Sequence, residues 1–259
     1  MSHSFRQAQI MDIARREGML TVDGLATHFD VTHQTIRRDL SELAQEGVLE
    51  RVHGGAILRG STSNIGYEKR QTLNADGKEA MARGCAAHIP DQITLFLDIG
   101  TSTEAVARSL GAHTGLIVVT NNLNVANILA GHESCDVIVT GGQLRRSDGG
   151  LTGTLAREAI GRFKFDIAVT SCSALDADGD MMDFDTQEIG LRQAILQQTR
   201  QRIVLADHTK LTRTAPARIG SLSEVEMIIT DRPLPPELAK ACASWKTDVH
   251  VAPEDQSSR

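Results

Sequence analysis

Hydrophobic residues in the first sixty positions recur three and four residues apart, which is the spacing of helices that bury one side. Gly18 ends the first predicted helix, and Thr21 and Thr32 stand where they can cap a second and a third. The third helix is predicted from Thr32 to about Gln45, and Gly47 ends it. The apolar stripes of the three helices are Ile10, Ile13 and Ala14; Val22, Leu25, Ala26 and Phe29; and Ile36, Leu40 and Leu43.

An extended pattern follows the third helix. The stretch "VLERVHGGAIL" (residues 48–58) places a Gly-Gly pair between two apolar runs, which predicts a strand, a turn and a second strand. Residues 60–77 are small and polar with no sustained period, and we interpret them as a linker. The expected organisation is therefore a first domain over residues 1–59, the linker, and a second domain over residues 78–259.

The second domain has a different pattern of hydrophobic positions, in which short apolar runs alternate with helical stretches. The runs are "ITLFLDI", "LIVVT", "DVIVTGG", "FDIAVTS", "RIVLAD" and "MIITD". Helices are predicted over residues 78–89, 103–110, 123–130, 154–163 and 187–199. Buried strands that alternate with helices are typical of an α/β domain with a mostly parallel sheet.

The third predicted helix carries two adjacent arginines, Arg37 and Arg38, on the side opposite its apolar stripe. On a helical wheel with Ile36 at zero, Arg37 and Arg38 fall at about 100° and 200°, with Gln34 and Ser41 between them. Polar side chains near a helix start, flanked by arginines, suit the major groove of DNA. The second and third helices then form a helix-turn-helix, and the hairpin is a wing. The DNA-binding candidates are Thr32, His33, Gln34, Thr35, Arg37, Arg38, Ser41, Arg51 and His53.

The net charge of the chain is not that of a typical basic DNA-binding domain. The whole chain has a net charge of −6, and residues 1–59 hold seven arginines against eight acidic residues. We explain this by segregation, because Asp39, Glu42 and Glu46 fall on the flank away from Arg37. An ordinary solvated helix and a helix-turn-helix that recognises protein rather than DNA remain alternatives.

Cysteine use and hydropathy indicate a cytoplasmic protein. The four cysteines are widely separated, which predicts buried thiols in a reducing compartment and no zinc site. No signal core opens the chain, and no apolar run approaches the ~18 residues that cross a bilayer. Five aspartates between Asp176 and Asp185 lack the order of a calcium loop. We therefore expect no metal, no cofactor and no membrane partner.

One strand end has the composition of an anion site. In "ITLFLDIGTST" a buried strand is followed by Asp98, by Gly100 and by three hydroxyl residues that open a helix. Ligands of open α/β sheets lie beyond the carboxyl ends of strands, and a helix start attracts phosphate. Capping of the helix is the alternative. The effector-binding candidates here are Asp98, Gly100, Thr101, Ser102 and Thr103; at later strand ends they are Asn121, Asn122, Gly141, Gly142 and Lys210. Plain turns remain open for the asparagines and glycines, and a surface lysine for Lys210.

Several of these stretches together resemble one family of bacterial repressors. "TIRRDLSELAQEGVLERVHGGA" resembles the N-terminal signature of the DeoR family, and "LDIGTSTEAVA", "VTNNLNVANIL" and "GGQLRRSDGGLTG" resemble its sensor domain. The resemblance runs in order from about Phe5 to beyond Lys210. It implies a winged helix-turn-helix followed by an α/β sensor domain similar to ribose-5-phosphate isomerase and the CoA transferases. "TSCSALDADG" departs from the family, because Ser171, Cys172 and Ser173 replace a more glycine-rich turn.

The resemblance also implies partners. Such repressors bind double-stranded operator DNA as dimers or tetramers and respond to phosphorylated sugars or polyols, with sn-glycerol 3-phosphate the best candidate here. The alternative is a sugar-phosphate isomerase-like enzyme that carries an appended DNA- or protein-binding module. In that case Glu188, Asp98 or Asp176 is the candidate general base.

Overall fold

The computed structural model describes residues 5–17, 19–52, 54–58 and 66–253. The three N-terminal helices are present as predicted: α1 (Phe5–Glu17), α2 (Val22–Phe29) and α3 (His33–Gln45). Thr21 and Thr32 cap α2 and α3, with their hydroxyls 3.1 and 3.2 Å from the backbone nitrogens of Gly24 and Thr35. The residues of the three predicted stripes pack in one core, and all of them are buried except Phe29, which is half-buried.

The wing is a three-stranded antiparallel sheet rather than a simple hairpin. Strands β2 (Leu49–Val52) and β3 (Gly55–Leu58) confirm the prediction, and β1 (Met19–Thr21) pairs with the other side of β3. Three residues are too few to show an alternating pattern, so β1 had no signal in the sequence. Gly55 is required by this close pairing, because a Cβ there would lie 1.8 Å from the carbonyl oxygen of Leu20.

Part of the segment interpreted as a linker is helical. Helix α4 (Tyr67–Thr72) lies inside the range 60–77, and α5 (Ala75–Ala86) begins before the predicted 78. The linker prediction is wrong for these residues because a six-residue helix is too short to display a helical period. Residues 59–65 lie outside the described part of the chain.

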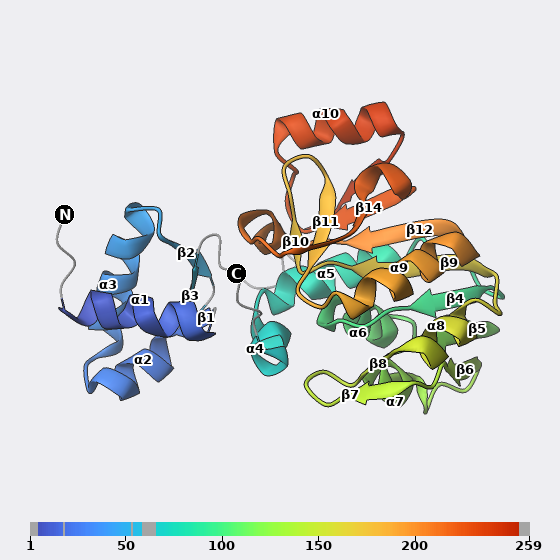
Figure 1. Cartoon of the computed structure of the whole chain (residues 1–259), viewed down its shortest axis with the longest axis horizontal. Coiled ribbons are helices and arrows are strands. Elements are labelled where there is room, and N and C mark those ends of the chain that lie inside the picture. Colours follow the sequence, from blue (N-terminus) through green and yellow to red (C-terminus); the bar gives the residue numbers. More distant parts are fainter. Residues whose placement is uncertain (1–4, 18, 53, 59–65, 254–259) are drawn as a thin grey trace.

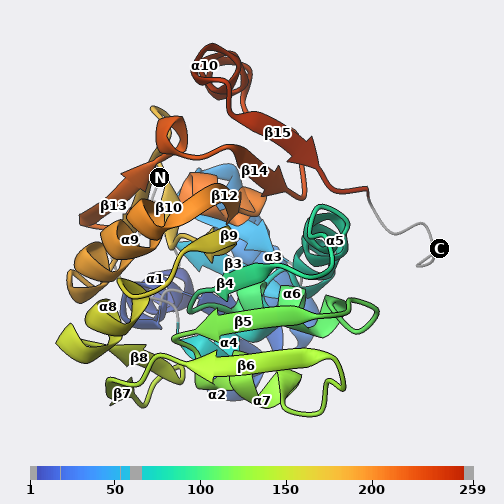
Figure 2. The same ribbon diagram turned by 90° about the vertical axis from the view of Figure 1, so that its right-hand side faces the viewer.

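The second domain confirms the expected α/β class. Its central sheet has seven parallel strands in the order β15-β14-β12-β9-β4-β5-β6. Helices α5, α6 and α7 cover one face, and α8 and α9 cover the other (Figure 2). The strands are β4 (Thr94–Leu97), β5 (Leu116–Thr120), β6 (Cys135–Val139), β9 (Phe165–Ser171), β12 (Thr199–Leu205), β14 (Met227–Thr230) and β15 (Asp248–Val251); the helices are α6 (Thr101–Ser109), α7 (Leu123–Leu129), α8 (Thr154–Ile160) and α9 (Gln187–Gln198).

The strand order places a topological switch point between β4 and β9. From β4 the chain proceeds through β5 to the edge strand β6, returns to add β9 on the other side of β4, and continues outward. The connections therefore leave β4 and β9 in opposite directions, which opens a crevice at their carboxyl ends. Open α/β sheets bind ligands in such crevices.

Smaller elements surround this crevice. A hairpin of β7 (Gln143–Arg145) and β8 (Gly150–Thr152) lies beside it, and β10 (Ala174–Leu175), β11 (Asp180–Asp183) and β13 (Ala217–Ser221) form a separate sheet. None of these short strands was predicted. The remaining elements are the 3-10 turns η1 (His208–Thr212) and η2 (Leu222–Glu224) and helix α10 (Pro236–Trp245).

The cysteines agree with the expected buried thiols except at one position. Cys85, Cys172 and Cys242 are buried and free, whereas Cys135 is free but half-buried. Within the described ranges, no helix is long and apolar enough to cross a membrane.

Candidate functional site

The face of α3 expected to meet DNA is accessible. Gln34, Arg37 and Arg38 are exposed, opposite the fully buried Ile36, and α3 lies in the N-terminal part of the molecule that Figure 1 shows apart from the large sheet. The wing reaches the same helix, since Arg51 Nη1 donates to the carbonyl oxygen of Arg37 at 3.3 Å. The remaining candidates on α3 are Thr32, His33, Thr35 and Ser41, of which Thr32 and His33 are exposed. His53 lies outside the described residues.

The acidic residues of α3 are neutralised in two different ways. Asp39 is buried and accepts hydrogen bonds from Arg6 at 2.5 and 3.2 Å, which ties α1 to α3. Glu42 accepts from Arg38 Nε at 3.0 Å, and this hydrogen bond lowers the pKa of Glu42. The segregation expected from the sequence concerned Arg37, and it is Arg38 that pairs with Glu42, one turn along α3. Arg37 forms no ion pair with an acidic residue in the described part of the chain.

A cavity of about 360 Å³ lies at the switch point, beyond the carboxyl ends of β4 and β9. The turn after β4, the turn after β9, helix α4, the β7–β8 hairpin, the segment after β11 and η1 all contribute to its walls. Its lining residues include Tyr67, Arg70, Gly100, Thr101, Ser102, Arg145, Asp148, Ser171, Cys172, Ser173, Asp183, Asp185, Glu188, Arg192 and Lys210.

Four of the predicted effector-binding residues line this cavity: Gly100, Thr101, Ser102 and Lys210. Gly100 has a φ of +145°, and a Cβ there would lie 2.8 Å from the hydroxyl of Ser171, so glycine lets the two turns approach closely. Asp98 lies just beneath, where its carboxylate pairs with Arg192 Nη2 at 3.1 Å.

The other five predicted residues do not line the cavity. Thr103 donates to the carbonyl oxygens of Asp98 and Gly100 at 2.6 and 2.7 Å, so its hydroxyl is bound to the turn after β4. Asn122 caps α7 through Asn124, and Asn121 is completely buried. Gly141 and Gly142 precede β7. For the asparagines and glycines the physical reason is the strand order, because β5 and β6 lie on the far side of β4 from β9.

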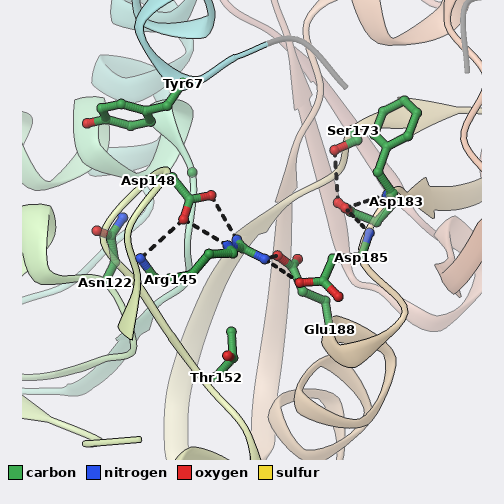
Figure 3. Close-up of polar contacts among 12 residues, drawn as sticks. Tyr67, Asn122, Arg145, Asp148, Thr152, Ser173, Asp183, Asp185 and Glu188 are labelled. Atoms are coloured by element: carbon green, nitrogen blue, oxygen red, sulfur yellow. Dashed lines mark hydrogen bonds and ion pairs between the residues drawn. The ribbon is translucent and has the colours of Figure 1, made fainter. Parts of the chain in front are cut away.

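The acidic wall of the cavity was not predicted. Its centre is Arg145, whose guanidinium bonds Asp148 at 2.8 Å, Asp185 at 2.7 Å and Glu188 at 2.6 Å (Figure 3). Burial opposes the charge on Arg145, but these hydrogen bonds and charges raise its pKa above the ordinary value. The carboxylates come from a hairpin, a loop and α9, so only the tertiary fold brings them together.

The cavity is also lined by cations, and part of their hydrogen-bonding capacity is unused. Arg192 is 2% exposed; its Nη2 donates to Ser171 O at 2.6 Å, while its Nη1 has no partner among the described residues. Lys210 is 7% exposed and forms no ion pair within the described ranges, and burial lowers its pKa. Helix α6 begins at the same cavity with no side-chain cap. Buried cations beside a free helix start form a site for an anion.

No metal site is evident in the described ranges, where no group of three or more His, Cys, Asp or Glu side chains is arranged to hold an ion. Two of the three candidate general bases are already engaged: Asp98 pairs with Arg192, and Glu188 pairs with Arg145. Asp176 does not line the cavity.

Glu188 makes the stability of the protein depend on pH. Burial, and next to it the negative charge of Asp183, raise its pKa to about 7 against the lowering effect of Arg145. A carboxyl whose pKa is higher in the folded state stabilises the fold at low pH and loses this effect as pH rises. We expect Glu188→Gln to raise the melting temperature at pH 8 relative to wild type, with little difference near pH 4. Melting curves between pH 4 and 8 measure this, and an equal pH dependence in both proteins would contradict it.

Comparison with known proteins places both parts of the chain in one family. A DeoR-like helix-turn-helix domain matches residues 6–62, and a DeoR C terminal sensor domain matches residues 73–232. The chain is 39% identical over 251 residues to the glycerol-3-phosphate regulon repressor of Escherichia coli (strain K12), covering 97% of this chain and 98% of that protein. It is 41% identical over 230 residues to the protein of the same name from Haemophilus influenzae, covering 89% and 90%.

Other similarities are more distant. The HTH-type transcriptional repressor CsqR of Escherichia coli is 37% identical over 236 residues, covering 91% of this chain and 90% of that protein. Among solved structures, a D-ribose-5-phosphate isomerase in complex with phospho-erythronic acid matches with a TM-score of 0.38 and 17% identity, over 52% of each chain. Because both domain matches and the full-length relatives agree, this chain belongs to the DeoR family, with its helix-turn-helix and its sensor domain in the family's order.

Proposed function

We propose that this protein is a transcriptional repressor whose affinity for operator DNA is controlled by a phosphorylated sugar or polyol. Helix α3 and the wing bind the operator. The protein acts as a homo-oligomer, a dimer or tetramer, which carries several such DNA-binding domains. The best candidate for the effector is sn-glycerol 3-phosphate. Support comes from the relatives that are named glycerol-3-phosphate regulon repressors and from the cavity of the sensor domain.

The observation that carries the proposal is that two unlike groups of side chains line one cavity. The start of α6, the Nη1 of Arg192 and the ammonium of Lys210 offer donors and positive charge to a phosphate. Asp185 and Glu188, which line the same cavity, accept hydrogen bonds from hydroxyl groups. A small molecule that carries both a phosphate and hydroxyl groups satisfies both groups of side chains.

Operator binding is expected to require more than one copy of the chain. A single recognition helix contacts only a few base pairs, and helix-turn-helix proteins gain discrimination by reading two half-sites. The family relatives are repressors, and we propose that this chain likewise acts by binding and not by catalysis.

The proposal is tested on the purified full-length protein with an operator selected from random-sequence DNA. Fluorescence anisotropy then measures operator affinity with sn-glycerol 3-phosphate, with glycerol and with inorganic phosphate. We expect sn-glycerol 3-phosphate alone to change operator affinity and to raise the melting temperature, since a ligand at 100 times its Kd stabilises the native state by about 2.7 kcal/mol. Turnover of ribose 5-phosphate, or no response to any phosphorylated three- to six-carbon polyol, would contradict the proposal.

A further inference from the structure

Helix α4 contacts both the effector cavity and the wing. Tyr67 and Arg70 on one side of this helix line the cavity. Lys69 Nζ donates to the carbonyl oxygen of Met19 in β1 at 3.1 Å. Leu73, directly after the helix, packs with Met19 and Ile57 of the wing sheet in a small cluster whose three members are each no more than 3% exposed. We call Met19, Ile57 and Leu73 the wing junction; in Figure 1, α4 lies between the N-terminal helices and the large sheet.

A first set of contacts joins the cavity to the wing junction through α4 itself. The side chain of Arg70 pairs with Asp148 at 3.2 Å in the cavity wall. Its carbonyl oxygen accepts hydrogen bonds from Thr101, at the start of α6, and from Lys78. Lys78 Nζ also donates to the carbonyl oxygen of Leu73 at 2.7 Å. A ligand that draws Arg70 toward the start of α6 therefore acts directly on the backbone that positions Leu73.

A second set of contacts reaches the same point from Lys210. His208 belongs to the same 3-10 turn as Lys210, and its ring nitrogen Nδ1 and backbone nitrogen lie 2.6 and 2.7 Å from the carboxylate of Asp231. Asp231 also accepts from Asn74 Nδ2 at 2.8 Å. Since Asn74 follows Leu73, two of the cations that line the cavity, Arg70 and Lys210, are linked to one turn of the chain.

We propose that the wing junction transmits effector binding to the DNA-binding domain. This inference rests on the proposed function and names the element that regulates the site. A phosphate held at the start of α6 by Arg192 and Lys210 attracts Arg70, which lines the same cavity, and displaces the α4–α5 turn. Leu73 and Lys69 then change the placement of the wing. The effector shifts the equilibrium only by its difference in affinity for the two arrangements. The junction contains three buried side chains, so its repacking requires no rearrangement of either domain core.

The test compares three variants with wild type by a thermodynamic cycle on the full-length protein. Leu73→Ala removes the apolar contact, Lys69→Met removes the hydrogen bond to Met19, and Asn74→Gly removes the link to Asp231. Asn74 has a φ of +51°, which glycine adopts without strain. Leu155→Ala is the matched control, because Leu155 is 69% exposed on α8. Operator affinity is measured with and without saturating sn-glycerol 3-phosphate, and affinity for sn-glycerol 3-phosphate with and without operator.

The measured quantity is the ratio by which one ligand changes affinity for the other, and this ratio is the same in both directions. Wild type and Leu155→Ala are expected to show a ratio within the usual range of about 5–150. The three junction variants should bind each ligand but bring the ratio at least about threefold closer to one. If Leu73→Ala unfolds the DNA-binding domain, the other two variants decide, since neither opens a cavity in a core.

Two negative results are distinguishable. A wild-type ratio of one for sn-glycerol 3-phosphate and for the other phosphorylated polyols contradicts the proposed function itself. A large wild-type ratio that Lys69→Met and Asn74→Gly both retain, with both ligands still bound, overturns the role of the wing junction and leaves the proposed function standing.

Discussion

Replacing Arg37 and Arg38 together by alanine is expected to lower operator affinity by about 2–6 kcal/mol, roughly thirtyfold to twenty-five-thousandfold, because each arginine contact with a base or phosphate contributes about 1–3 kcal/mol. Both side chains are exposed on the face of α3 opposite Ile36, so the change leaves the core of the domain intact. Fluorescence anisotropy over a range of salt concentrations measures the effect. The variant should also show a slope of log affinity against log salt that is smaller by about two.

The matched control is Arg200→Ala, which removes an exposed arginine from the sensor domain. It should leave operator affinity unchanged, and both proteins should bind sn-glycerol 3-phosphate with wild-type affinity. A double variant that binds operator like wild type would show that another surface reads the DNA. A wild-type protein with no salt-dependent affinity for any DNA would favour protein recognition by the helix-turn-helix.

Much of the fold was predictable because its signals are local. The caps at Thr21 and Thr32 and the stripe through Ile36 depend on residues within one or two turns of each other. The six apolar runs all form strands of the central sheet, of which the edge strand β6 is only partly buried. Most of the missed elements are short: β1, α4 and the strands of the hairpin beside the cavity are each between three and six residues long. Elements of that length form through tertiary contacts and leave no period in the sequence. The ten-residue helix α10 is the exception, since it was not predicted either.

The candidate site was only partly predictable because it depends on strand order. Gly100, Thr101 and Lys210 follow β4 and β12, which lie on either side of β9, and they meet at the switch point. Asn122 and Gly141 follow β5 and β6 with the same local pattern, but those strands extend away from the switch point. The sequence shows which residues end strands, and it does not show which strands are neighbours.

The residues missed in the cavity illustrate a second limit. Arg192 lies on α9 and is 2% exposed, yet nothing in its neighbourhood distinguishes it from a solvated arginine. Arg70 was inside the range interpreted as a linker. Arg145 bonds three carboxylates that lie 3 to 43 positions away in the sequence. The burial of a charged residue depends on the whole fold, so it cannot be predicted from the spacing of residues along the sequence.

The second large effect is expected from replacing Lys210 in the cavity. Lys210 is buried without an ion pair in the described ranges, and burial lowers its pKa, so its charge destabilises the unliganded protein. We expect Lys210→Met to raise the free energy of unfolding by roughly 1–2 kcal/mol at pH 7, a size common for stabilising substitutions at functional positions. The same change should weaken binding of sn-glycerol 3-phosphate by about 2–5 kcal/mol, roughly thirtyfold to several thousandfold.

If Lys210→Met raises the stability and lowers the ligand affinity, Lys210 binds the ligand and does not support the fold. A lysine whose pKa is lower in the folded state destabilises the fold most at low pH, so the advantage of Lys210→Met should shrink as pH rises toward about 10.4. Calorimetric unfolding and ligand titration on the same samples measure both quantities. Lys240→Met, at an exposed lysine on α10, is the control and should change neither. If Lys210→Met lowered stability and left ligand affinity intact, the lysine would support the fold, and the phosphate would have to be bound elsewhere.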